Sequence, residues 1–267
     1  MKDTFSYWMR TNLKDAYSGL ITQDIDFVFI SKQKDHFFFI EEKNSPRARV
    51  GVAQQIIFKL FNDYLLNNPP LFLGTHILHI SYPDKNLLKE RINKIKSGQV
   101  EKPSYEIGED TLRRLWDCKG NPQIKKTEAE RSQYRGSIIK ENLHIFKRDF
   151  LFIENIHWIF VNYCTGYFIF IEELTNNEEI KEERKKFIDT IDEIFRANQK
   201  SIAKNPKSGA IYQYLGYYRL KFSRTNPDNS LEIYLNSKKI SKEELIDVLN
   251  LDDNKILRYI IKIKPLI

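Results

Sequence analysis

The feature that most constrains this chain is a pattern that occurs twice, 131 residues apart. Residues 24–42 align with residues 155–173, and each segment consists of two apolar, β-prone runs separated by a short turn. The identical pairs are Ile25/Ile156, Phe29/Phe160, Phe37/Phe168, Phe39/Phe170, Ile40/Ile171, Glu41/Glu172 and Glu42/Glu173. The pattern predicts two β-hairpins of the same design.

Further matches flank the two hairpins in the same order. An amphipathic helix is predicted after each one, at residues 52–67 in the first half and around residues 187–195 in the second. A strand follows each helix, at 71–81 and at 214–223. These collinear blocks favour a tandem duplication over chance similarity between two hairpins rich in Phe and Ile. A weaker alternative treats the second half as an unrelated recognition domain.

The predicted domain organisation follows from this repeat. A first unit would span residues 1–118 and a second unit residues 137–267, with the polar segment 119–136 as a linker. In the first unit, further helices are expected at 4–17, 85–97 and 109–117. Strands alternating with helices predict an α/β protein in which each unit is a mixed β-sheet flanked by helices.

Composition restricts the compartment and the class of partner. The formal net charge of +7 and the pI of about 9.1 suit a polyanionic partner, because a cation that meets a phosphate releases a condensed counterion. Two cysteines without zinc-site spacing favour a reducing cytoplasm. No apolar run approaches the roughly 20 residues of a membrane span, so we expect a soluble protein with no membrane partner.

The candidate chemistry lies on the first hairpin, at Asp26, Glu41 and Lys43. Strand alternation places Glu41 and Lys43 on one face of the sheet and turns Glu42 away. Two carboxylates suit Mg²⁺, which prefers oxygen ligands and keeps several waters. A bound metal can lower the pKa of water and neutralise charge on a phosphate, and a nearby ammonium can stabilise the transition state.

The second hairpin lacks most of this set. Asp26 corresponds to His157 and Lys43 to Leu174, whereas Glu41 persists as Glu172. Leucine carries no charge, and a lone imidazole is a poor substitute in an oxygen-ligated magnesium site. The comparison predicts a single active site in each chain.

At these residues the first hairpin resembles the core of the PD-(D/E)XK, or restriction-endonuclease-like, nuclease superfamily. An acidic residue opens one strand and a second apolar strand ends in Glu-x-Lys; nuclease-related (NERD-type) domains are similar. The resemblance implies two restriction-endonuclease-like units, the second degenerate. It implies Asp26 and Glu41 as ligands of Mg²⁺, for which Mn²⁺ can substitute, with the backbone carbonyl of Glu42 completing the shell. Lys43 would assist catalysis, and Asp24 is the competing choice for the first acid.

Four more residues are candidates for nucleic-acid binding. Arg47 and Arg49 follow Lys43 closely and are placed to clamp a backbone phosphate, with solvated loop charges as the alternative. Related exonucleases carry Q-x-x-x-Y on the next helix, where this chain has Gln54 and Gln55 without the tyrosine. A glutamine there can still contact phosphate or substrate; the alternative is a solvent-facing helix residue.

The function expected from this combination is a metal-dependent endonuclease that hydrolyses phosphodiester bonds. The resemblance favours DNA over RNA and leaves room for a homodimer or for partner subunits. The alternative is a non-enzymatic nucleic-acid-binding or scaffolding protein on a degenerate nuclease fold.

Overall fold

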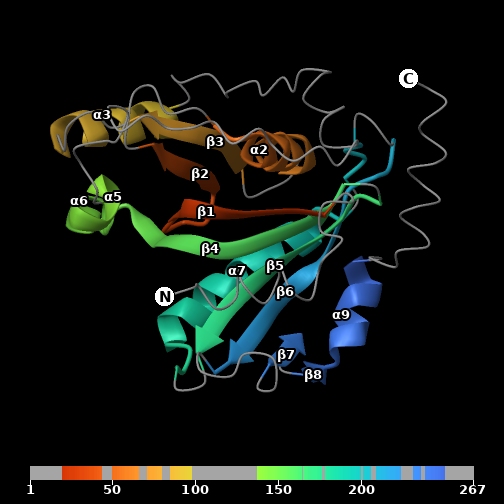
Figure 1. Ribbon diagram of the computed structural model, residues 1–267. Helices are drawn as coiled ribbons and strands as arrows, with labels where there is room; N and C mark the ends of the chain where they lie inside the picture. Colours follow the sequence, from red (N-terminus) through yellow and green to blue (C-terminus); the bar gives the residue numbers. More distant parts are fainter. Residues whose placement is uncertain are drawn as a thin grey trace, which may run out of the picture. The chain divides into compact units, whose positions relative to one another are not determined.

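The computed structural model shows an α/β protein whose strands run in mixed directions (Figure 1). The residues that it describes are 20–43, 50–65, 71–79, 85–97, 137–163, 165–175, 178–199, 201–205, 209–223, 231–235 and 238–249. The helices expected at 4–17 and 109–117, and the linker expected at 119–136, lie outside these residues. No helix in the described part is both long and apolar enough to cross a membrane.

The described residues group into two compact units. The first unit comprises the described residues of 25–97 together with 137–155, and the second comprises those of 156–249 together with 20–24. Residues 137–155 therefore group with the first hairpin rather than the second. The division predicted from the repeat, at residues 118 and 137, stays a prediction.

The first unit is built on the first predicted hairpin. Strands β1 (Leu20–Ser31) and β2 (His36–Lys43) are antiparallel, and β3 (Leu71–His79) lies parallel to β2 on its other side. Helix α2 (Val52–Leu65) connects β2 to β3, as a parallel pair requires. The helices α3 (Lys85–Lys96), α5 (Ile138–Glu141) and α6 (Leu143–Phe146) complete the unit.

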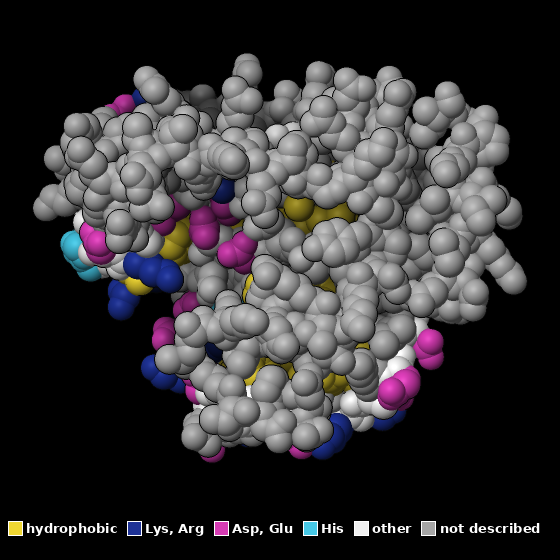
Figure 2. Space-filling view, viewed as in Figure 1, with side chains coloured by type: hydrophobic (Ala, Val, Ile, Leu, Met, Phe, Trp, Pro, Cys, Tyr) yellow, Lys and Arg dark blue, Asp and Glu magenta, His cyan; other side chains and the backbone are white. Residues whose placement is uncertain are grey.

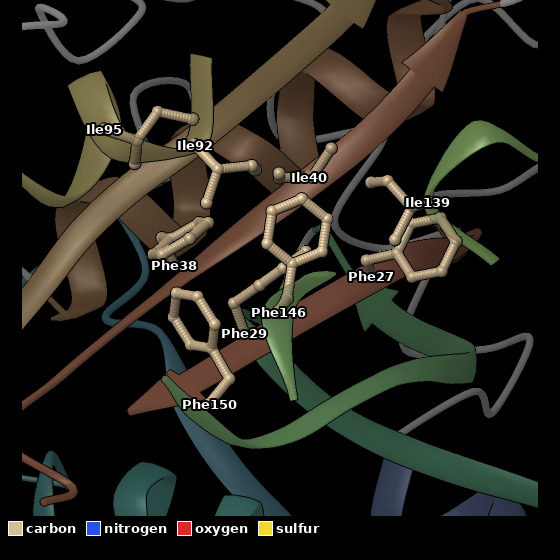
Figure 3. Close-up of a cluster of buried hydrophobic side chains, with 9 residues drawn as sticks. All are labelled: Phe27, Phe29, Phe38, Ile40, Ile92, Ile95, Ile139, Phe146 and Phe150. Carbon is tan, nitrogen blue, oxygen red and sulfur yellow. The ribbon is translucent and has the colours of Figure 1, made fainter. Parts of the chain in front are cut away.

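Strand β2 is buried on both faces. Phe38 and Ile40 point into an aromatic and aliphatic cluster beneath α3, α5 and α6, which Figure 3 shows with Phe27, Phe29, Ile92, Ile95, Ile139, Phe146 and Phe150. On the opposite face Phe39 packs against Phe61 of α2 and Phe72 of β3, each ring centroid 5.2 Å away. The near-continuous apolar run of β2 is the pattern expected of such a strand.

The second unit repeats this arrangement and then extends it. Strand β4 (Phe150–Asn162), which belongs to this unit from residue 156 onward, is antiparallel to β5 (Tyr167–Thr175). Helix α7 (Glu182–Ala197) follows, and β6 (Gln213–Phe222) is parallel to β5. Beyond β6, the unit adds β7 (Glu232–Leu235), β8 (Lys238–Ile240) and α9 (Lys242–Leu249). Both predicted hairpins thus lead into a helix and a parallel third strand.

The two parallel pairs share an irregularity in their register. Between Phe37 and Phe39 of β2 the partner strand advances by one extra residue, and the same shift occurs between Phe168 and Phe170 of β5. Gly74 and Gly216 lie in these bulges with φ of 100° and 133°, a backbone region that residues with a Cβ rarely adopt. A shared bulge at a shared glycine supports a common design for the two copies.

The turn between β4 and β5 supplies a test of the fold. Gly166 has φ of +80°, and a Cβ added there would lie 2.5 Å from the carbonyl oxygen of Ile211. Gly209, which precedes β6, is the control: its φ is +70°, and a Cβ added there would have nothing within 4 Å. We expect Gly209→Ala to cost about 1–2 kcal/mol for the left-handed backbone alone. Gly166→Ala should cost roughly 1–3 kcal/mol more because the backbone must also shift. Equal losses in urea unfolding of the two variants would contradict this packing of the turn.

Candidate active site

The end of β2 divides its charged residues between two faces. Phe39 faces α2, so Glu41 and Lys43 face the same helix by strand alternation. Glu42 faces the other way, where its Oε1 accepts a hydrogen bond of 3.0 Å from the backbone N–H of Ile139 in α5. The carboxylate of Glu42 is therefore directed away from Glu41, as the Glu-x-Lys spacing predicted.

Glu41 and Lys43 form a buried ion pair. Glu41 is 4% exposed, and its Oε1 lies 2.6 Å from Nζ of Lys43. The desolvation of two charges offsets most or all of their attraction in such a pair, so an ion pair at this depth is weak evidence for a stabilising role. The pair lies at the C-terminal end of β2.

Gln54, in the first turn of α2, joins this pair. Its Nε2 donates to Oε1 of Glu41, while its Oε1 accepts from Nζ of Lys43 at 2.9 Å and from the backbone N–H of Gly51 at 3.2 Å. Gln54 is 8% exposed, whereas the sequence offered it as a nucleic-acid contact or a solvent-facing residue. Gln55 is more exposed and donates to the carbonyl of Val50 at 3.0 Å. Arg47 and Arg49 lie outside the described residues.

Asp26 lies across the hairpin from Glu41. Phe27 pairs with Ile40, and continuing this antiparallel register by one residue sets Asp26 opposite Glu41, on the same face. Oδ2 of Asp26 accepts a 2.7 Å hydrogen bond from the backbone N–H of Glu42. Asp24 is exposed and accepts from Gln23 at 2.6 Å. The contact with β2 favours Asp26 over Asp24 as the first acid.

Burial changes the pKa of Glu42, the other acidic residue near the end of β2. Desolvation raises the pKa of the Glu42 carboxyl, and the neighbouring charge of Asp26 adds to the rise. Hydrogen bonds from Ser137 and Ile139 act in the opposite direction, because they favour the ionised form. The side chain of Glu42 thus serves the junction with α5, which leaves its backbone carbonyl as the group that the resemblance assigns to a metal.

The second unit contains a different set at the corresponding positions. Nδ1 of His157 accepts from the backbone N–H of Glu173 at 3.2 Å, the contact that Asp26 makes with Glu42. Glu172 is 2% exposed, and Arg184 of α7 binds both its oxygens, at 2.8 Å and 2.6 Å. The hydroxyl of Tyr217 adds a third hydrogen bond at 3.3 Å. Glu172 is closed into a structural ion pair.

Arg184 was not among the sequence-based candidates, because it lies in the highly charged segment 181–186 and such segments usually form solvent-exposed helix faces. Both Gln54 and Arg184 are the third residue of their helix. The buried apolar residues follow at the same intervals, as Ile57 and Phe58 do in α2 and Phe187 and Ile188 in α7. Aligning the two helices on their apolar stripes, with a shift of 130 rather than 131, would have matched the two residues.

The capacity of the first site for a metal rests on Asp26 and Glu41. Nowhere in the described part of the chain do three or more His, Cys, Asp or Glu residues form a group that could hold a metal ion. Two carboxylates at a strand end fit Mg²⁺, which commonly takes only one or two carboxylates from the protein and completes its shell with water and substrate oxygens. They fit Zn²⁺ poorly, because zinc sites use three or four nitrogen, sulfur or carboxylate ligands from the protein.

Comparison with known proteins identifies relatives in one archaeon. Two proteins of Archaeoglobus fulgidus, each described as an uncharacterized protein, are similar to this chain. One is 56% identical over 143 residues, which make up 51% of this chain and 93% of the relative. The other is 46% identical over 135 residues, or 45% of this chain and 92% of the relative.

The chain belongs to the family of these archaeal proteins. Each relative is matched over nearly its whole length by about half of this chain, so the family includes proteins of about half its length. No family model matches the chain. No solved structure matches it either.

The imidazole of His157 provides a pH test of the second site. Burial lowers its pKa from the ordinary value of 6.5, with Glu172 opposing the shift and Arg184 adding to it. The unfolded chain therefore binds more protons than the folded chain just below pH 6.5, and stability falls as pH drops through that window. In His157→Asn, an amide can still accept from Glu173 but does not titrate. We expect this variant to lose less stability than the parent between pH 7.5 and 5.5 in urea unfolding. An unchanged pH slope would contradict the lowered pKa of this half-buried imidazole.

Proposed function

We propose that this protein is a magnesium-dependent nuclease that hydrolyses phosphodiester bonds of DNA at one active site per chain. The observation that carries the proposal is the buried pair of Glu41 and Lys43 at the end of β2, with Asp26 opposite on β1. A buried ion pair is weak evidence for a stabilising role, and Asp26 and Lys43 distinguish this site from the equally buried pair of Glu172 and Arg184. The PD-(D/E)XK resemblance of the same three residues supports this reading.

Each residue has a role that its position supports. Asp26 and Glu41 would hold the magnesium ion, together with the backbone carbonyl of Glu42. The bound ion would supply an acidified water and positive charge beside the scissile phosphate. Lys43 would orient the attacking water or add positive charge where the transition state becomes negative. Its ammonium sits within a site of low exposure, where such a charge acts more strongly than in water.

The described residues visible in Figure 2 include both basic and acidic side chains. Lys and Arg side chains and Asp and Glu side chains both appear on this face. The net charge of +7 still favours a polyanion overall. Binding through backbone phosphates would weaken steeply with salt, and DNA rather than RNA is favoured by the family resemblance alone.

A second candidate is a non-enzymatic nucleic-acid-binding or scaffolding protein. The closed pair of Glu172 and Arg184 favours it, because it shows that this fold can retain the buried glutamate for structural purposes. The two candidates differ in what magnesium does: a nuclease turns over DNA with it, and a scaffold only binds.

Site variants test the proposal directly. We expect the protein to cleave plasmid DNA with Mg²⁺ or Mn²⁺. Glu41→Gln and Lys43→Ala should each lower the cleavage rate by at least about 100-fold, since each removes an electrostatic element of the transition state. Lys59→Ala is the matched control, because Lys59 pairs with Asp63 on the outer surface of α2 at 2.9 Å.

The outcomes separate the two candidates. Circular dichroism of each variant establishes that loss of activity is not loss of fold. Glu172→Gln breaks a buried ion pair and should lower the stability by about 3–5 kcal/mol while leaving cleavage by the folded protein unchanged. If the parent binds DNA but never cleaves it with either metal, the scaffolding candidate replaces the nuclease.

The asymmetry between the copies predicts the form of the product. One working site per chain cuts one strand at a time, unlike a symmetric nuclease whose two-fold axis presents a site to each strand. Supercoiled plasmid should become nicked circles first and linear molecules later. The time course must be followed across protein concentrations, because dimerisation could supply a second site. Immediate linear product at a rate independent of protein concentration would contradict a single site.

A further inference from the structure

One helix position contacts the strand-end glutamate in both units. Gln54 is the third residue of α2 and reaches Glu41, and Arg184 is the third residue of α7 and reaches Glu172. The helices hold this position firmly, because the apolar residues that follow are buried in both. These are Ile57, Phe58 and Phe61 in α2 and Phe187, Ile188 and Ile191 in α7.

The cation that neutralises the glutamate comes from a different element in each unit. In the first unit it is Lys43, two residues along the same strand, and the helix contributes the neutral amide of Gln54. In the second unit Leu174 replaces the lysine, and the helix contributes the guanidinium of Arg184. Each buried glutamate therefore has an adjacent cation. In the first unit the cation is on the strand and the helix residue is neutral, whereas in the second unit the helix residue is itself the cation.

We propose that this helix position determines whether the strand-end glutamate belongs to an active site or to a closed ion pair. Gln54 is a positioning residue that holds Glu41 and Lys43 in one geometry, and Arg184 is the residue that closes the second site. The inference rests on the proposed nuclease function and extends it to a residue whose sequence-based assignment was nucleic-acid contact.

An amide is the side chain suited to this task. Its Nε2 donates to the carboxylate of Glu41 while its Oε1 accepts from the ammonium of Lys43. The N–H of Gly51 also donates to Oε1, and this contact fixes which end of the amide faces the carboxylate. A carboxylate at this position could not donate, and an ammonium could not accept.

Arginine at the same helix position closes the site, because all of its side-chain polar groups are donors. Its planar fork donates to both oxygens of Glu172, and Tyr217 adds a donor to Oε2. A carboxylate held by three donors in this way offers little to a divalent cation. The closure explains why Glu172 persists in a copy that has lost the lysine and the first acid.

Removing the amide contacts tests the positioning role. Gln54→Met keeps the length of the side chain and deletes all three hydrogen bonds of the amide. We expect kcat to fall at least about tenfold, because displaced reacting groups are penalised steeply. DNA affinity measured without divalent metal should change less than about twofold. Lys59→Met places the same side chain on the outer surface of α2 and serves as the control.

These measurements separate the failure of this inference from the failure of the proposed function. A parent that does not cleave overturns the nuclease proposal itself. If the parent cleaves and Gln54→Met cleaves equally well, the positioning role is wrong. If instead DNA affinity falls in step with kcat, Gln54 contacts nucleic acid, which also overturns it.

A graft from the second unit tests the closed state without any need for activity. Lys43→Leu alone leaves Glu41 without its cation, and Gln54→Arg alone sets two cations against one carboxylate. Each single variant should lower Tm by several degrees, and the double variant should recover most of the loss because it rebuilds the pair of Glu172 and Arg184. The double variant should also fail to bind Mn²⁺ in a calorimetric titration. A double variant no more stable than either single variant would overturn the inference.

Discussion

The two-sided burial of β2 is the constraint on which the rest of the first unit depends. Phe38 and Ile40 fill one core while Phe37 and Phe39 fill the other, so a shift of one residue would exchange every side chain between faces. Because the register is held in this way, Glu41 can only face α2 and Glu42 can only face α5. The candidate site is a consequence of the aromatic packing that precedes it on the same strand.

Comparison of the two units shows which side chains can differ while the arrangement of strands and helix stays the same. Both keep the hairpin, the connecting helix, the parallel third strand and the bulge at a glycine, and both bury a glutamate at the end of the second strand. The groups around that glutamate differ completely between the copies. A buried carboxylate must be neutralised by a partner, and the scaffold accepts a cation from either the strand or the helix. Proteins of about half this length in the same family are consistent with one unit as the basic building block.

Much of the fold could be read from periodicity. The strand at 36–42, the helix beginning at residue 52 and the strand beginning at residue 71 were each predicted close to their observed bounds. The strand predicted at 25–31 ends where expected but begins earlier, at Leu20. Their apolar patterns are local, and aromatic residues leave little choice of face. The packing of residues 137–155 against the first hairpin was not predicted, since it depends on Phe146 and Phe150 meeting Phe29 from far along the chain.

The candidate site was likewise predicted only in part from the sequence. The sequence by itself determined that Glu41 and Lys43 share a face and that Glu42 does not, because alternation along a strand is a property of the backbone. It also showed that His157 and Leu174 occupy the positions in the second hairpin that align with Asp26 and Lys43. Only the tertiary structure decided that Gln54 lies between Glu41 and Lys43 and that Arg184 closes over Glu172. Those contacts join a helix to a strand, and their geometry follows from how the apolar face of the helix packs, which no spacing in the sequence specifies.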